Sequence, residues 1–107
     1  MSFVTYVPVI ATDAIAPGDM REVDMDGRNI MVANVGGEFF AFQPDCPHNG
    51  SSLDGGLLDG KAVLCPNHHY RFDLQSGELL YPPGACENLT VYTVEPRDGM
   101  VCLKIEL

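Results

Sequence analysis

The chain has 107 residues, of which 6 are basic and 15 are acidic, so its formal charge is −9. A chain of this length buries roughly two-thirds of its unfolded surface, and we expect a single domain over residues 1–107. The acidic excess excludes nucleic acid as a partner, since a phosphate backbone binds clustered Lys and Arg side chains. It also argues against an anionic membrane surface and favours a partner with a basic face.

Nothing in the sequence suggests a membrane protein or a secreted one. No apolar run approaches the length of about 18 residues that spans a bilayer, and the first residues lack the basic and apolar regions of a secretory signal. We therefore expect a cytoplasmic protein. In that compartment its 4 cysteines are better explained as metal ligands and reduced thiols than as disulfides.

The first part of the chain predicts β-structure. Residues rich in β-branched and aromatic side chains form strand-like runs at 3–9, 20–25, 29–35 and 38–42. A short helical turn is expected near Asp13, between the first two runs. Asp26-Gly27 and Gly36-Gly37 separate the last three runs and favour tight hairpins, so these runs predict a three-stranded meander.

The middle of the chain has a different composition. Residues 43–84 are dense in Gly, Pro, Asp, Asn and Ser, and only 62–65 and 70–72 resemble short strands. Regular strands return at 89–95 and 101–107. We therefore predict an all-β, antiparallel domain in which residues 1–42 and 85–107 form a base. A loop-rich subdomain, approximately residues 43–84, is inserted into it.

The predicted insert carries all 3 histidines and two of the cysteines. Cys46 and His48 flank a proline, and after sixteen intervening residues Cys65-Pro66-Asn67-His68 follows. Each half can place two ligands on one metal centre, and its proline restricts the backbone between them. Thiolate and imidazole together suit either zinc or an iron–sulfur cluster with mixed ligands.

The pattern C-x-H-x16-C-x-x-H, with Pro after each Cys and Tyr70-Arg71-Phe72-Asp73 after the last ligand, resembles the Rieske iron–sulfur family. The resemblance implies a Rieske-like antiparallel β-sandwich or partial barrel with one 2Fe–2S cluster per chain. It also implies that Cys46 and Cys65 bind one iron of that cluster, while His48 and His68 bind the other.

Two departures narrow the resemblance to the soluble Rieske ferredoxins. Ser51 and Asn67 stand where the quinol-oxidising members of the family carry an additional pair of cysteines that form a disulfide. Phe72 stands where those members have a tyrosine whose hydroxyl donates to the cluster, and Tyr70 stands where they have a donating serine, so only Tyr70 could supply a hydroxyl here. With fewer such donors, we expect a potential near the low end of the Rieske range, which is about −150 to +300 mV.

The function implied by this resemblance is electron transport. The chain would be a monomeric one-electron carrier between a flavin-dependent NAD(P)H reductase and a terminal oxygenase, and not an enzyme itself. With two histidines on the cluster, only His69 remains, too few for the two histidines and carboxylate of a catalytic iron. No G-x-G-x-x-G motif indicates a nucleotide site.

Other interpretations stay open from the sequence alone. The chain could instead be a permanent subunit, similar to the Rieske-like small subunit of assimilatory nitrite reductase, or a module whose loops are held by zinc. Cys86 and Cys102 lack a partner motif and are expected to be reduced thiols. The run 82–84 is either a simple turn or part of a loop that covers the cluster.

Overall fold

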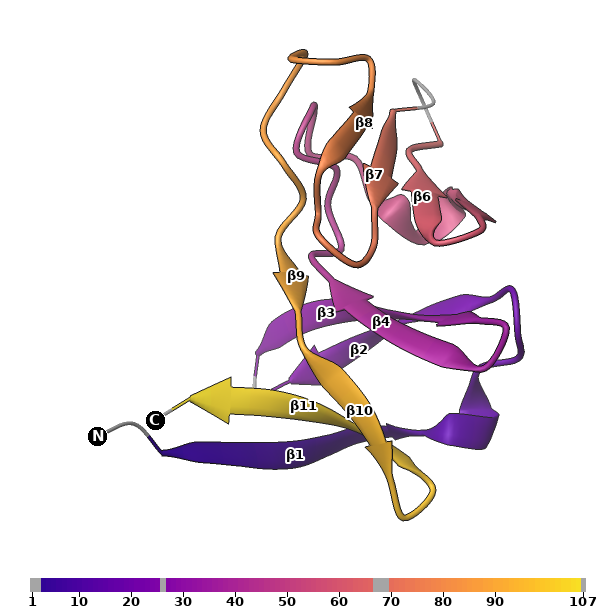
Figure 1. The fold of residues 1–107 in the computed structure, drawn as a ribbon, viewed down its shortest axis with the longest axis vertical. Coiled ribbons are helices and arrows are strands. Elements are labelled where there is room, and N and C mark those ends of the chain that lie inside the picture. The colour runs from indigo at the N-terminus through magenta and orange to yellow at the C-terminus, as the bar shows by residue number, and fades with distance from the viewer. Residues whose placement is uncertain (1–2, 26, 67–69, 107) are drawn as a thin grey trace.

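The computed structural model describes residues 3–25, 27–66 and 70–106. Within these ranges the chain forms β-strands and two short 3-10 turns, arranged as three antiparallel sheets (Figure 1). The antiparallel all-β class predicted from the sequence is confirmed. Within the same ranges, no helix is long and apolar enough to cross a membrane.

The first sheet has the strand order β1-β11-β10, formed by Val4–Ala11, Met100–Glu106 and Val94–Arg97. Its register shifts just after Pro8. Proline has no N–H to donate to a neighbouring strand, and this strand lies at the edge of its sheet, where such a residue is tolerated. The predicted helical turn is present as the 3-10 turn η1 (Thr12–Ala14).

The second sheet contains the predicted meander. Its order is β2-β3-β4-β9, formed by Met20–Met25, Arg28–Val35, Glu38–Phe42 and Val91–Tyr92. Gly36 and Gly37 make the turn between β3 and β4, and both have positive φ (61° and 97°), a conformation that glycine adopts without steric cost. Asp26, in the other predicted turn, lies outside the described residues.

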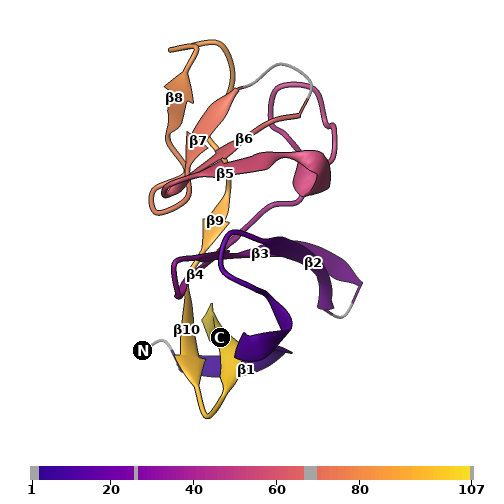
Figure 2. The ribbon, with the colours of Figure 1, turned by 90° about the vertical axis from the view of Figure 1, so that its right-hand side faces the viewer.

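The third sheet stands above the other two (Figure 2). It consists of β5-β6-β7-β8, formed by Leu57–Asp59, Ala62–Leu64, Arg71–Asp73 and Leu79–Tyr81, with the turn η2 (Leu53–Gly55) before it. The prediction of only two strands in this region was wrong, because β5 and β8 were missed. Both border Gly or Pro residues, at 55–56 and 82–83, which indicate turns in a sequence.

The predicted strand at 89–95 was also wrong as a single element. It divides at Thr93 into β9, which pairs with β4, and β10, which pairs with β11. The chain therefore passes from one base sheet to the other within one apolar run. The sequence of the run carries no sign of this change, since the pairing depends on distant strands.

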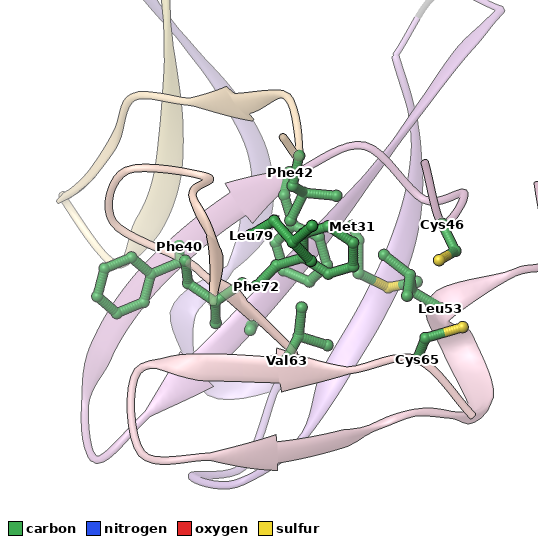
Figure 3. Close-up of a cluster of buried hydrophobic side chains, with 12 residues drawn as sticks. Met31, Phe40, Phe42, Cys46, Leu53, Val63, Cys65, Phe72 and Leu79 are labelled. Atoms are coloured by element: carbon green, nitrogen blue, oxygen red, sulfur yellow. The ribbon is translucent and has the colours of Figure 1, made fainter. Parts of the chain in front are cut away.

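Strand β3 lies between two hydrophobic cores. Met31 and Ala33 belong to the core beneath the third sheet, together with Phe42 and Phe72 (Figure 3). The alternate residues, including Ile30, belong to a second core between the base sheets. Because successive side chains of a strand point to opposite faces, one buried strand joins the two cores.

Asn34 is a polar side chain buried at the end of β3, only 4% exposed. Its Nδ2 donates to the carbonyl of Ile15 at 2.8 Å, and its Oδ1 accepts from the N–H of Gly37 at 2.8 Å. Asn29, on the same strand, is exposed and donates to Glu22 at 2.6 Å. The two asparagines therefore make comparable hydrogen bonds in different environments.

We predict that Asn34→Ala lowers the melting temperature by more than about 4 °C. It leaves the carbonyl of the buried Ile15 without its donor at a cost of about 1–3 kcal/mol, and 1 kcal/mol corresponds to about 4–8 °C in a domain of this size. The control Asn29→Ala changes the exposed surface and should stay within about 4 °C. Equal shifts, measured by circular dichroism, would contradict this account of Asn34.

Candidate metal centre

The first predicted ligand loop is a closed turn held by its own backbone. The N–H of Cys46 donates to the carbonyl of Ser51 at 2.7 Å, and the N–H of Gly50 donates back to the carbonyl of Cys46 at 2.8 Å. Gly50 has a φ of 76°, which explains the glycine at this position. A bridge between Asp45 and Ser52 closes the base of the loop. The position of Cys46 is therefore fixed from both sides.

The second loop begins at the end of β6. Cys65 follows Leu64 directly, and its N–H donates to the carbonyl of Tyr70 at 2.8 Å, so the chain returns to the same place five residues later. His68, the fourth predicted ligand, lies outside the described residues, as does His69.

The structure brings Cys46 and Cys65 together. Both are buried, with 1% and 0% of their surfaces exposed, and Figure 3 shows them at the same edge of the core, beside Leu53. Burial raises the pKa of the Cys46 thiol above its usual range, and the Cys65 thiol raises it further. Hydrogen bonds from the backbone N–H groups of His48 and Asn49 act in the opposite direction.

These groups fit a soft metal centre. Two neighbouring thiolates in a buried site would repel each other, and a bound cation removes this cost. The backbone N–H groups that reach Cys46 stabilise negative charge on its sulfur, as expected for a ligand. Among the described residues, no group of three or more His, Cys, Asp or Glu side chains is placed to hold a single metal ion.

His48 lies in the same loop as Cys46, and its Nδ1 atom is buried. The imidazole stacks on the ring of Tyr70, with 4.1 Å between ring centroids and 23° between ring planes. The stacking joins the two loops and restricts rotation of the imidazole. The sequence singled out Tyr70 only as a possible hydroxyl donor, and its packing role could not be read from spacing.

Gly56 lies at a close approach between the turn η2 and the end of β6, just before Cys65. Its N–H donates to the carbonyl of Leu53 at 2.9 Å, and a Cβ built at this position would collide with the carbonyl oxygen of Leu64. Two successive glycines, such as Gly55-Gly56, commonly indicate a tight turn in a sequence. Instead, Gly56 has an extended backbone (φ −80°, ψ −180°), so it is required by a close approach of two segments.

The structure describes all four cysteines, and none forms a disulfide. Cys86 packs against the core that contains Cys46 and Cys65, and burial raises the pKa of its thiol, with further contributions from Glu87 and Cys65. Cys102 is only 6% exposed. It lies on β11, the central strand of the first sheet.

A family model described as the Rieske [2Fe-2S] domain matches residues 5–93. The chain belongs to the Rieske family. The resemblance seen in the sequence, the Rieske-like fold and the 2Fe–2S cofactor are thereby confirmed.

Individual Rieske proteins are similar over nearly the whole chain. The biphenyl dioxygenase ferredoxin subunit of Pseudomonas sp. (strain KKS102) is 39% identical over 100 residues, covering 91% of both chains. The ferredoxin of carbazole 1,9a-dioxygenase from Nocardioides aromaticivorans IC177 superimposes with a TM-score of 0.83 at 28% identity, covering 92% of this chain and 96% of that one.

A third Rieske relative comes from a complex of reduced oxygenase and oxidized ferredoxin in carbazole 1,9a-dioxygenase. It is 32% identical with a TM-score of 0.82, and the match covers 92% of this chain and 91% of the other. These similarities extend through the base and the third sheet alike, so the whole domain corresponds to that of a dioxygenase ferredoxin.

We predict that Gly56→Ala accelerates loss of the Rieske cluster at least fivefold. The added methyl group forces Gly56 away from the end of β6, next to Cys65, and overpacking of about 1–3 kcal/mol corresponds to about fivefold or more in a rate. Bleaching of the visible absorbance at a fixed elevated temperature measures this loss.

The neighbouring Gly55 provides a matched control for this prediction. A Cβ at Gly55 would meet only Pro66, at an ordinary distance of 3.9 Å, and its φ lies outside the positive range. Gly55→Ala should therefore bleach at the rate of the unaltered protein. The account of Gly56 fails if both variants bleach equally.

Proposed function

We propose that this chain is the ferredoxin component of a multicomponent oxygenase system. It would carry single electrons from a flavin-dependent, NAD(P)H-oxidising reductase to a terminal oxygenase. The observation that carries the proposal is the match, over 91% of both chains, to a protein that is itself a dioxygenase ferredoxin subunit. Such relatives favour this role over a nitrite reductase subunit or a zinc module.

The proposed ligands are Cys46 and Cys65 on one iron and His48 and His68 on the other. The adjacency of the two buried cysteines and the buried Nδ1 of His48 support the first three. The C-x-x-H spacing supports His68. When bound, a cluster with these ligands supplies one-electron redox chemistry at about −150 to +300 mV, above the roughly −400 mV of a four-cysteine plant-type cluster.

The protein contributes an asymmetric environment to this centre. The cysteine side chains face the apolar core and are shielded from water, whereas His48 is only half-buried. The stacked Tyr70 holds the imidazole in place. Electrons would therefore enter and leave on the imidazole side, where a partner can approach most closely.

The remaining parts of the proposal concern the rest of the chain. Residues 43–84 would act as the cluster-binding subdomain, and the two-core base would keep its loops rigid, so that little protein rearranges on reduction. A monomer in the cytoplasm fits the unpaired cysteines, because that compartment keeps thiols reduced. The charge of −9 fits a reductase or an oxygenase with a basic docking face.

The ligand set and the function can be tested with one pair of variants. Cys65→Ser should contain less than about a tenth of the normal iron and acid-labile sulfide, because a buried hydroxyl does not replace a thiolate. It should also support no electron transfer to a terminal oxygenase. Cys102→Ser changes a cysteine that is also buried but distant from the site, and it should retain the cluster and the activity.

The biphenyl dioxygenase reductase and terminal oxygenase of Pseudomonas sp. (strain KKS102) are the first pair to test for turnover, followed by those of the other relatives. Normal iron in Cys65→Ser would remove Cys65 from the ligand set. A cluster-loaded protein that sustains turnover with none of these pairs would contradict the proposed function.

A further inference from the structure

The third sheet exposes an unusual amount of apolar surface. Among the described residues, five large hydrophobic side chains are exposed, and three of them belong to this sheet: Leu57 (70%), Leu80 (44%) and Tyr81 (62%). Isolated exposed apolar side chains need no explanation, but a group on one face commonly marks an interaction site.

The strand register places these side chains in one row. Leu57 pairs with Leu64, Leu64 with Arg71, and Arg71 with Tyr81, so all four side chains point to the same face. Their sequence neighbours on the opposite face, Val63 and Phe72 among them, are buried in the core. The row is therefore the outer face of the sheet.

A β-bulge adds Leu80 to this row. In the pairing of β7 with β8 the register shifts, so that Leu79 opposes Phe72 and Tyr81 opposes Arg71, which leaves Leu80 as an extra residue. Bulges redirect side chains in this way. Accordingly, Leu80 and Tyr81 line the same hollow of about 510 Å³, together with Leu64 and Arg71.

The hollow continues toward the proposed cluster ligands. A second hollow of about 280 Å³ is lined by Leu57, Leu64, Cys65 and Pro66 along with Gly55. Because Leu64 lines both, the two hollows form one strip, which we call the outer strip: Leu57, Leu64, Arg71, Leu80 and Tyr81. One end of the outer strip thus borders a proposed ligand of the cluster.

The outer strip contains no acidic side chain, although the protein is strongly acidic. Its one cation, Arg71, is paired with the neighbouring Asp59 at 2.9 Å. The guanidinium has five N–H donors, so an ion pair with a single carboxylate leaves it able to donate further hydrogen bonds. This chemistry suits a partner surface that presents an apolar side chain beside a carbonyl or carboxylate oxygen.

We propose that the outer strip is a docking surface for the terminal oxygenase. An apolar side chain of the oxygenase enters the hollow between Leu64 and Tyr81, and an oxygen acceptor beside it binds Arg71. The acidic remainder of the surface attracts a basic partner at long range, whereas the strip determines the close fit. This inference rests on the proposed function.

Two observations favour the oxygenase as the occupant. A 32% identical relative comes from a complex of an oxygenase with its ferredoxin, so this class of partner is one that such a domain contacts directly. The strip also borders Cys65 and Pro66, where the second ligand loop begins. A protein seated on it can extend over that loop to the imidazole side of the proposed cluster, where electrons would leave.

The test compares two double variants. Leu80→Ser with Tyr81→Ser removes apolar surface from the strip. Phe3→Ser with Val4→Ser removes side chains of similar exposure (66% and 48%) at β1, in the base, far from β8 (Figure 1). Both double variants should keep the visible spectrum and reduction potential of the unaltered protein, which shows that the fold and the cluster are intact.

Turnover is measured with a reductase and oxygenase pair that the unaltered chain supports, starting with the biphenyl dioxygenase pair of Pseudomonas sp. (strain KKS102). With the oxygenase limiting, we expect the strip variant to raise the KM for ferredoxin at least fivefold with little change in kcat. Its rate of reduction by the reductase should be unchanged, and the base variant should behave like the unaltered protein.

Four results would overturn the proposal. The KM for the strip variant in the oxygenase reaction could be unchanged, its KM could rise only in the reductase reaction, or the KM for the base variant could rise equally. The fourth is that the unaltered protein is a dimer and the strip variant is a monomer. The last would assign the strip to a second copy of the chain. A failure of the proposed function gives a different result from these four. In that case the unaltered, cluster-loaded chain supports no turnover with any pair, and the docking proposal fails with it.

Discussion

Two cysteine side chains are buried side by side where the chain's loops meet its core, and the rest of the structure depends on this adjacency. Cys46 and Cys65 lie 19 positions apart in the sequence, and each is placed by a backbone hydrogen bond that closes its own loop. As thiolates held this close in an apolar setting they would repel each other, and a bound cation would remove that cost. The third sheet and η2 serve to bring them together and to keep water out.

The base supports this arrangement from below. Strand β3 contributes alternate side chains to both cores, so the third sheet rests on a strand that is itself fixed from the other side. The stacking of Tyr70 on His48 connects the two ligand loops, and Gly56 lets η2 approach the end of β6, next to Cys65. Loops held in this way would rearrange little on reduction of a bound cluster, which would favour rapid one-electron transfer. The same sheet has its outer face free to contact a partner.

The sequence predicted the parts of the structure that are encoded locally. The meander and its turn at Gly36-Gly37 follow from short-range chemistry, and the structure agrees with them. The Cys and His spacing indicated the family, which the family model confirms. Strands β5 and β8 were missed because they border Gly and Pro residues that indicate turns. The division at Thr93 and the need for Gly56 arise from distant segments that the sequence does not reveal. His68 lies outside the described residues, so its role stays a prediction.

The most direct test of the central claim is a redox titration of the purified protein followed by electron paramagnetic resonance. Mixed Cys and His ligation predicts a single one-electron centre near the low end of the range of about −150 to +300 mV. Its reduced form should have a lower average g value than an all-cysteine cluster. A potential near −400 mV with the g values of a four-cysteine cluster, or a colourless protein containing zinc, would contradict the account.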